Sequence, residues 1–468
     1  MFKFEKLKET KLSFILPIIS LCIIGAITVF STTYSNEVSD LFSNHLVFYL
    51  VGFILFFLIS AVNPTRLKSK PVNLLVVTVS IISLFAVLLW GTEIYGAQRW
   101  IDLGFFSFQP SEFAKVAIIM FTAFCFGVKT KKENEDIFNI YALSDNSFTT
   151  LKKILASEAF IKYLLAFLFY GISVFLIIKQ KSLGNSILLT LIFISMLVLN
   201  LNIQSRFLIL AIPIMVGICI SFNVPDLSNL FSVVGFNANI ILIVLFVIFL
   251  KGIASKLKLN FILLLLFFVG GLLVNPLLQF AYGNVLELYQ RQRIESFVGS
   301  EDNANLFQNE DFNRQMSILA VGSGRVFGKG LLNGNIVNSR LLPFAYTDFA
   351  FAGFAEQFGF IGSIIIITLY LVLLLKIFKI FAKTQDPYYR FICIGGVSLI
   401  FFNCAQHIAM NMGITPITGV PLPLISYGGS SILSIFIGLG IINAIDVFGD
   451  NDVQVESLKK DYGFTNRS

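Results

Sequence analysis

Long apolar runs alternate with short charged segments along the whole chain. About twelve of these runs are long enough to cross a membrane as helices, because roughly 20 apolar residues span a bilayer core. They predict membrane spans at 12–31, 45–62, 72–90, 111–128, 160–178, 183–201, 206–222, 237–253, 259–281, 348–378, 390–411 and 428–448. The pattern therefore predicts an all-α polytopic membrane protein.

Lysine and arginine residues concentrate in alternate loops, and this distribution predicts the orientation of the chain. Positive residues are retained on the cytoplasmic side of membranes. Both termini, a loop at 129–159 and a tail at 449–468 are therefore expected in the cytoplasm, and a long loop at 282–347 is expected outside. One short turn disagrees, because Lys179 and Lys181 fall on the predicted outer side.

Composition supports a membrane protein and argues against a nucleic-acid partner. The chain is 56% hydrophobic and only 13% charged, whereas soluble domains are about 25% charged. The net charge of +7 is explained by the cationic loops that topology requires. The five cysteines lie in apolar runs and suggest neither disulfides nor a metal site. No soluble domain is evident, so residues 1–468 are expected to form a single integral membrane domain.

The predicted outer side carries four polar stretches with chemistry-bearing residues. They are 96–101 followed by 109–112, the glycine-rich segment at 322–330, the segment at 342–349, and the Pro- and Gly-rich run at 413–431. Non-helical backbone at a membrane edge must line a cavity or be buried in protein. The glycines are expected to form turns that approach a ligand closely. Together these stretches indicate an extracytoplasmic site on a membrane-embedded scaffold.

Two carboxylates stand out where the polar segment at 342–349 enters an apolar span. Asp348 lies at the start of the span, where it could cap the helix or act chemically. Glu356 lies two turns deeper among apolar residues. An ionisable group at such a position indicates a functional site, or alternatively a structural pair with a cation on another span.

A third charged group begins the span at 111–128. Glu112 and Lys115 are three residues apart, on one helical face. Lys115 could extend to the membrane interface or bind a phosphate-bearing headgroup. His407, late in another span, is expected to be a hydrogen-bonded structural histidine.

The chain contains no Ser–His–Asp arrangement, no Cys/His metal motif and no paired-carboxylate motif. One carboxylate, several cations and a lipid-accessible scaffold remain. This combination fits transfer chemistry on an anionic, lipid-linked substrate.

Four motifs in order resemble the SEDS family (shape, elongation, division and sporulation; RodA, FtsW and SpoVE). They run from Gly96 to Lys115, Gly322 to Gly330, Thr347 to Gly362 and Thr418 to Ser431. The resemblance covers about residues 12–448 and is closer to the RodA branch. Departures occur beside Asp348, at Phe344 and Tyr346, and at Lys181. The segments 206–222 and 237–253 exceed the family's usual ten spans, so ten to twelve helices are expected.

The resemblance implies a peptidoglycan glycosyltransferase that polymerises lipid II by an inverting reaction with a lipid diphosphate leaving group. It implies that Asp348 is the catalytic base. The residues expected to bind substrate are Arg99, Glu112, Lys115, Arg293, Lys329, Glu356, Ser426 and Ser430. No organic cofactor is expected, but a divalent cation such as Mg²⁺ or Mn²⁺ could bind at Asp348.

The resemblance also implies a setting and a partner. A class B penicillin-binding protein would supply the transpeptidase, and the chain would lie in the cytoplasmic membrane among its lipids. Two rival functions stay open from the sequence. One is a flippase or transporter for lipid-linked precursors, and the other is an inactive scaffold for a partner synthase.

Overall fold

The structure, a computed structural model, describes residues 3–34, 39–94, 97–104, 106–128, 158–200 and 308–461. Met1–Met196 and Arg293–Ser468 form one compact unit, and Leu197–Gln292 form another. Apart from the end of one helix, the second unit lies outside the described residues, so only the first is described below. The expected single domain over 1–468 stays a prediction.

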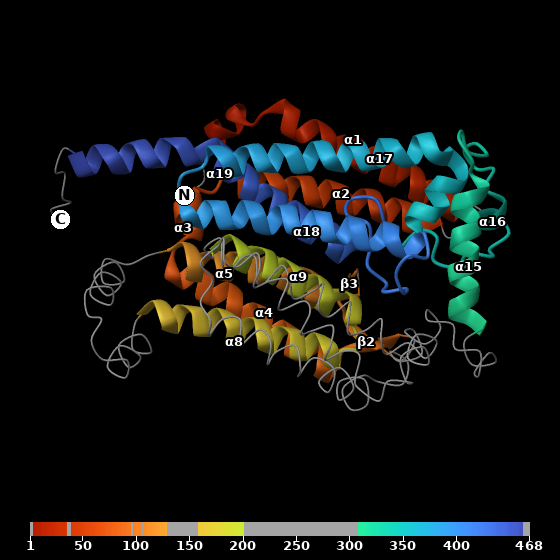
Figure 1. The fold of residues 1–468 in the computed structure, drawn as a ribbon, viewed down its shortest axis with the longest axis horizontal. Coiled ribbons are helices and arrows are strands. Elements are labelled where there is room, and N and C mark those ends of the chain that lie inside the picture. Colours follow the sequence, from red (N-terminus) through yellow and green to blue (C-terminus); the bar gives the residue numbers. More distant parts are fainter. Residues whose placement is uncertain are drawn as a thin grey trace, which may run out of the picture. The chain divides into compact units, whose positions relative to one another are not determined.

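The first unit is a bundle of long helices (Figure 1). Its helices are η1 (Phe4–Glu9), α1 (Leu12–Thr33), α2 (Ser39–Ser60), α3 (Pro64–Leu67), α4 (Lys70–Trp90), α5 (Pro110–Gly127), α8 (Glu158–Lys179), α9 (Leu183–Asn200), α15 (Gln308–Ser323), α16 (Asn335–Asn338), α17 (Ala350–Lys383), α18 (Pro387–Asn411) and α19 (Gly429–Asp461). Among the described residues, eight helices are long and apolar enough to cross a membrane, and Leu183–Val198 is a shorter apolar helix.

These helices confirm the predicted class of a polytopic helical membrane protein. Each predicted span within the described residues coincides with a helix. The predicted spans at 206–222, 237–253 and 259–281 lie outside the described residues, as does most of the loop at 129–159. The cytoplasmic placement of the termini stays a prediction.

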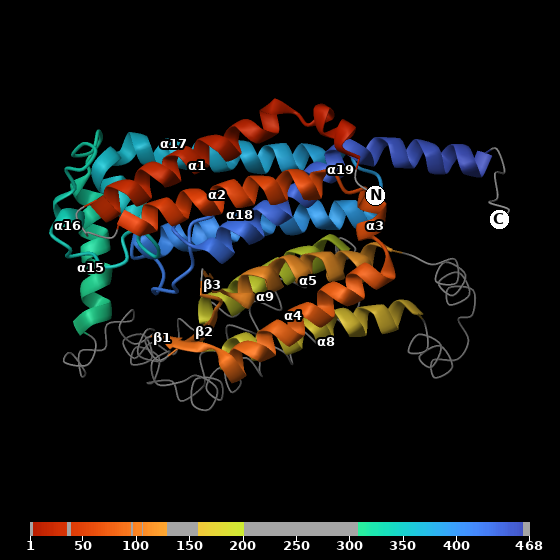
Figure 2. The ribbon, with the colours of Figure 1, turned by 180° about the vertical axis from the view of Figure 1, so that it is seen from behind.

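Two elements differ from the sequence prediction. A small antiparallel sheet, ordered β1–β2–β3, is formed by Thr92–Ile94, Ala97–Asp102 and Ser107–Phe108. Helix α15 occupies part of the segment expected to be a loop at 282–347, and it packs against α17 and α18. The sheet, α15 and α16 lie at one end of the bundle, and α3 lies at the other end (Figures 1 and 2).

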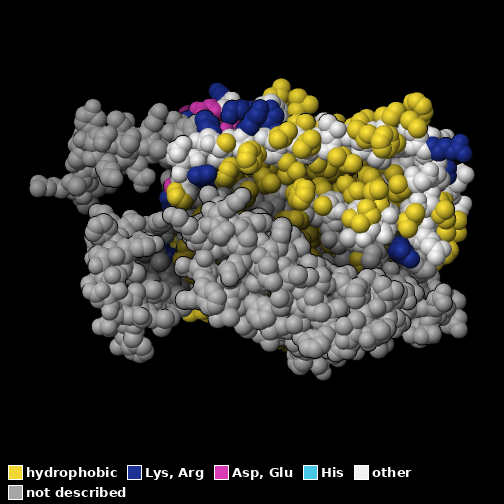
Figure 3. Space-filling model, in the orientation of Figure 1, with side chains coloured by type: hydrophobic (Ala, Val, Ile, Leu, Met, Phe, Trp, Pro, Cys, Tyr) yellow, Lys and Arg dark blue, Asp and Glu magenta, His cyan; other side chains and the backbone are white. Residues whose placement is uncertain are grey.

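The flank of the bundle is apolar, as expected for a surface that contacts lipid. Exposed apolar side chains follow α1 and α17, including Leu16 and Ile23 on α1 and Ile364, Leu371 and Phe378 on α17. Hydrophobic side chains cover this flank in Figure 3, and lysine and arginine side chains gather towards its ends.

Helix α17 is broken at Gly359, where φ is 66° and ψ is −161°. Residues 350–357, before the break, are buried, whereas Phe360 is 61% exposed. The predicted long span at 348–378 is therefore two pieces, a protein-enclosed first part and a lipid-facing second part.

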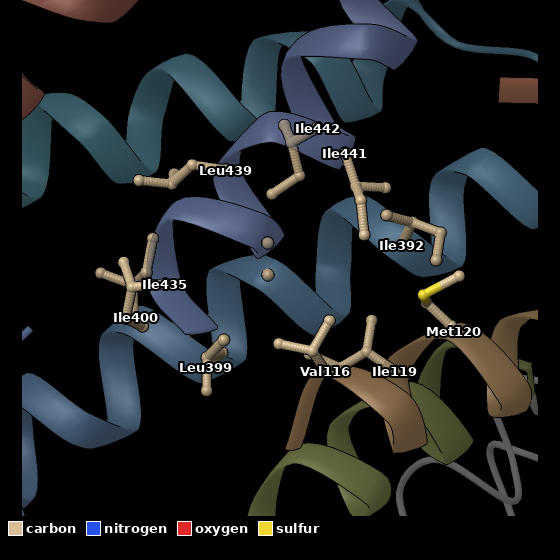
Figure 4. A pocket seen from close by; sticks show the side chains of 12 residues that line it. Val116, Ile119, Met120, Ile392, Leu399, Ile400, Ile435, Leu439, Ile441 and Ile442 are labelled. Carbon is tan, nitrogen blue, oxygen red and sulfur yellow. The ribbon is translucent and has the colours of Figure 1, made fainter. Parts of the chain in front are cut away.

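The glycines between α18, α5 and α19 differ in the space beside them. A Cβ on Gly395 would lie 2.6 Å from Ile119 Cγ2. The next residue, Gly396, and Gly438 of α19 line a small apolar cavity between the three helices (Figure 4). A Cβ on Gly438 would meet nothing closer than Leu399 Cδ2 at 3.9 Å.

These contacts predict opposite effects for two glycine-to-alanine substitutions. Gly438→Ala is expected to stabilise the protein by about 0.5–1 kcal/mol, because alanine favours a helix and the space is available. Gly395→Ala is expected to cost roughly 1–3 kcal/mol through overpacking against Ile119. Thermal unfolding of both variants in the same detergent measures this difference, and a lower melting temperature for Gly438→Ala would contradict the described packing.

Candidate active site

Asp348 precedes the first turn of α17, and side chains of α18 hold this turn in place. Asn411 Nδ2 donates to the Asp348 main-chain oxygen at 3.0 Å, and Asn411 Oδ1 accepts from Ala352 N at 3.0 Å. His407 Nε2 accepts from Phe351 N at 3.3 Å. Two N–H groups that a helix cap would normally bind are therefore already taken by α18.

The carboxylate of Asp348 is therefore not needed to accept from the N–H groups of Phe351 and Ala352. The N-cap residue of α17 is Phe349, and it makes no side-chain cap bond. The Asp348 side chain is only partly buried. This placement weakens the alternative that Asp348 is present to cap the helix.

Arg99 and Asp348 lie beside the same point of the chain, Gly419. A Cβ on Gly419 would be 3.5 Å from Asp348 Oδ2 and 4.0 Å from Arg99 Nη1. Arg99 Nη2 also donates to the main-chain oxygen of Lys181. The structure thus brings Arg99 close to Asp348, while a contact between Arg99 and a substrate stays a prediction. At Gly419, φ is 66°, so glycine fits both the backbone and the narrow space.

The Pro- and Gly-rich segment at 416–428 is held by buried rings from three spans. Each ring donates to a main-chain carbonyl, and the pairs are His407 with Val420, Tyr370 with Pro423, and Tyr49 with Leu424. Non-helical backbone within a membrane requires such partners. Of the two alternatives for this segment, burial in protein holds for residue 420 and residues 422–426, whereas residues 416–419 are only partly buried.

His407 has both ring nitrogens bonded to the main chain. Nδ1 must donate to Val420 O at 2.7 Å, so Nε2 is the acceptor for Phe351 N. A neutral ring satisfies both bonds. His407 therefore joins the segment at 416–428 to the start of α17, which confirms the structural role expected for it.

Ser426 and its neighbour join the same segment to the residues before Asp348. Ser426 Oγ donates to Thr347 O at 2.7 Å and accepts from Leu422 N at 2.9 Å. The main-chain N of Tyr427 donates to Tyr346 O at 2.8 Å. Burial raises the pKa of the Tyr427 phenol, so this hydroxyl stays protonated and can donate. The backbone at Asp348 is therefore held by Asn411 of α18 and by the bonds from Ser426 and Tyr427 to the residues before it.

Ser430 joins the small sheet to the last span. Its Oγ accepts from Gln109 N at 2.8 Å and donates to Ser107 O at 3.2 Å. These bonds place the start of α5 beside the start of α19. The hydroxyls of Ser426 and Ser430 already bond within the protein. Their contacts with a substrate stay predictions.

Glu356 forms an ion pair with Lys329. This is a structural pair, as one alternative held, but the cation comes from the glycine-rich segment at 322–330 and not from another span. Glu356 is fully buried, and its Oε1 accepts from Lys329 Nζ at 2.7 Å and from Ile336 N at 2.9 Å. Its Oε2 accepts from Val337 N at 3.1 Å. The pair fixes the segment between α15 and α17 that leads to Asp348. A substrate contact for either residue stays a prediction.

The glycine-rich segment at 322–330 docks onto the break in α17 rather than forming a free turn. Glu356 O and Gln357 O accept from the N–H groups of Lys329 and Gly330, and the N–H groups of Phe360 and Ile361 donate to residues 325 and 326. A Cβ on Gly324 would be 2.0 Å from Ala355 O. These glycines allow the backbone of the segment at 322–330 to lie close to the backbone of α17. The sequence had suggested instead that they approach a ligand.

Glu112 and Lys115 form a second buried pair, enclosed by three spans. Their contact is 2.8 Å, and each side chain is only 1% exposed. Lys115 Nζ also donates to Asn185 Oδ1 at 3.4 Å and to Asn403 Oδ1 at 3.5 Å. Lys115 therefore does not extend to the interface. Neither residue reaches a surface that a substrate could touch in this conformation, so their substrate contacts stay predictions.

Some contributors to the site were missed by sequence reasoning. Asn411 fixes both the Asp348 carbonyl and the first turn of α17, and Tyr49 and Tyr370 hold the segment at 416–428. Asn411 follows His407 by four residues on the same helical face, a spacing that could have indicated it. Arg293 lies outside the described residues. The described part of the chain holds no group of three or more His, Cys, Asp or Glu side chains placed for a metal ion.

The chain matches the family model of cell cycle proteins of the FtsW, RodA and SpoVE group over residues 11–234 and 203–451. It therefore belongs to the SEDS family. Among its relatives, the peptidoglycan glycosyltransferase RodA of Treponema pallidum is 27% identical over 92% of this chain and 96% of that protein. The peptidoglycan glycosyltransferase MrdB of Escherichia coli is 29% identical over 78% of this chain and 75% of that protein.

Solved structures support the fold. One chain of a peptidoglycan synthase complex has a TM-score of 0.59, with 20% identity over 94% of this chain and 98% of that chain. The rod shape determining protein RodA of Thermus thermophilus has a TM-score of 0.52, with 19% identity over 93% of this chain and 96% of that chain. At these identities the likeness shows the shared fold.

Proposed function

We propose that this chain is a peptidoglycan glycosyltransferase that polymerises lipid II, with Asp348 as the general base. The observation that carries the proposal is a partly buried carboxylate, fixed through its backbone by α18 and by the segment at 416–428, with the Arg99 guanidinium beside it. Family membership and the names of the relatives support the reaction class.

The site's residues suit a single displacement at a sugar carbon. A hydroxyl oxygen of the acceptor sugar forms a bond to the anomeric carbon of the donor, and the bond from that carbon to the lipid diphosphate breaks. Asp348 accepts the proton of the attacking hydroxyl. Arg99 stabilises the negative charge that grows on the departing diphosphate. One displacement inverts the anomeric centre.

A divalent cation is compatible with this site, although the described residues offer it few ligands. Mg²⁺ is commonly bound by one or two carboxylates together with substrate phosphates and water. Asp348 would supply the carboxylate for Mg²⁺ or Mn²⁺. When bound, such an ion neutralises phosphate charge. The Arg99 guanidinium lies close to Asp348 and can likewise neutralise the charge of a phosphate.

The proposal includes a setting and a partner. The chain contributes the polymerase, and a class B penicillin-binding protein in the same cytoplasmic membrane contributes the transpeptidase. The structural neighbour from a peptidoglycan synthase complex supports an assembly of this kind. Cross-linking in native membranes should capture such a transpeptidase, and its repeated absence would remove this part of the proposal.

The direct test is polymerisation of lipid II by the purified chain. Glycan strands on a denaturing gel support the proposal. Movement of labelled lipid II between leaflets without polymer would favour the rival transporter. Strands that form only after a partner synthase is added, and equally with an Asp348 variant, would favour the scaffold.

Arg99→Glu is expected to reduce polymerisation by about 10²–10³-fold, because it removes a cation from the leaving group and adds a charge that repels Asp348. Arg99→Lys should retain part of the rate, since it keeps the charge but loses the planar fork. Arg325→Glu is the matched control, because Arg325 is exposed and contacts α17 through its main chain. Equal losses for Arg99→Glu and Arg325→Glu would contradict a specific role.

A further inference from the structure

The turn between α8 and α9 contains a lysine in a backbone conformation that favours glycine. Lys181 has φ of 59°. The turn closes α8 through bonds from Gln180 N to Leu176 O, Lys181 N to Ile178 O and Ser182 N to Ile177 O. A left-handed residue just after a helix is usually glycine, because a side chain is strained there. A strained residue near a functional site points to a role for its side chain.

The charge of Lys181 is a second, independent anomaly. Lys179 and Lys181 lie on the predicted outer side, against the usual cytoplasmic bias of lysine. Lys115 and Lys329 pair with glutamates. Within the described residues, the ammonium of Lys181 makes no comparable ion pair with a carboxylate. Lys179 instead lies over the ring of Phe175, 5.9 Å from its centroid.

The turn also packs against the site described above. The Lys181 carbonyl accepts a bond from Arg99 Nη2. A Cβ on Gly184 would lie 2.7 Å from Thr418 O, so the start of α9 touches the residue before Gly419. Gly419 is the point beside which Asp348 and Arg99 meet. Lys181 therefore belongs to the surroundings of the Asp348 carboxylate.

We propose that Lys181 is a second cation for the diphosphate of the lipid-linked donor, acting beside Arg99. The inference rests on the proposed function and names a further substrate-binding residue for the same site. A diphosphate diester carries two negative charges, and two cations balance them. Arg99 offers a planar fork, and Lys181 offers a compact charge on a flexible stem. The main chain of Lys181 already touches the Arg99 guanidinium through its carbonyl, so its side chain starts from a residue in contact with Arg99.

The decisive variant is Lys181→Gly, because it should ease folding while weakening substrate binding. Glycine accepts the observed φ without strain, so the melting temperature should stay equal or rise. The KM for lipid II should rise about tenfold, as expected when a charge-assisted contact is lost. Lys181→Arg keeps the charge and should restore a KM within about threefold of the parent.

A binding experiment without turnover separates this inference from the proposed function. A short-chain polyprenyl diphosphate is titrated into the purified parent, Lys181→Gly and the matched control Lys179→Gln. The affinity of Lys181→Gly should fall about tenfold, and that of Lys179→Gln should change less than twofold. Binding by Lys181→Gly equal to the parent overturns the inference, and so does an equal loss in Lys179→Gln. A parent that binds the diphosphate but makes no glycan would instead refute the proposed function.

Discussion

The Asp348→Asn variant is expected to lose lipid II polymerisation by a factor of about 10²–10⁴, because it removes the general base but preserves the shape of the side chain. Its fold should persist, since the Asp348 contact with Asn411 uses the main-chain oxygen. Strand formation by purified protein measures the rate, and thermal unfolding confirms that the variant is folded.

Asp102→Asn is the matched control for Asp348→Asn. Asp102 is an exposed aspartate at the end of β2 whose Oδ1 accepts from Gly104 N at 2.9 Å. Its substitution should change the rate less than about twofold, as is usual for surface positions. A folded Asp348→Asn variant that polymerises at the parental rate would show that another group accepts the proton.

The Glu356→Gln variant is expected to show the largest loss of stability, about 3–5 kcal/mol, because it breaks an ion pair at a fully buried carboxylate and replaces one of its two accepting oxygens by an amide nitrogen that cannot accept. Glu356 is fully buried, and its two oxygens accept three bonds from the segment that leads to Asp348. The midpoint of thermal or denaturant unfolding in detergent measures this loss.

Two comparisons show whether the loss comes from the ion pair. Glu93→Gln, an exposed glutamate on β1, should unfold like the parent. Glu356→Met combined with Lys329→Met should be less destabilised than Glu356→Met alone, because the double variant buries no unpaired charge. A midpoint for Glu356→Gln that matches the parent would refute the structural role of this pair.

The spans could be predicted from sequence because a helix that crosses the lipid needs about 20 consecutive, mostly apolar residues. The break in α17 could not, since it depends on partners from elsewhere in the chain. The backbone groups freed around Gly359 are bonded by the segment at 325–330. The glycines of both segments were visible in the sequence, but their mutual contact was not.

Helix α15 shows a related limit. Its sequence begins with polar and charged residues, and its apolar run of four residues, 318–321, is too short to predict a span. Helices of this kind are stabilised by packing on other helices, here α17 and α18. Such packing is not visible in a local pattern.

The sequence named Arg99 and Asp348 as site residues, and the structure brings these two together beside Gly419. Their roles in the reaction stay predictions. The sequence did not predict the surroundings of Lys115, because its amide partners Asn185 and Asn403 come from two other spans. Single-sequence reasoning identifies a buried charge but not the distant side chains that enclose it.

The central claim is tested most directly by one measurement in liposomes that contain only this chain and fluorescent lipid II. Glycan polymer and transbilayer movement of the label are followed in the same sample, for the parent and for Asp348→Asn. The account predicts polymer from the parent and almost none from Asp348→Asn. Label movement without polymer, or equal polymer from both proteins, would contradict it.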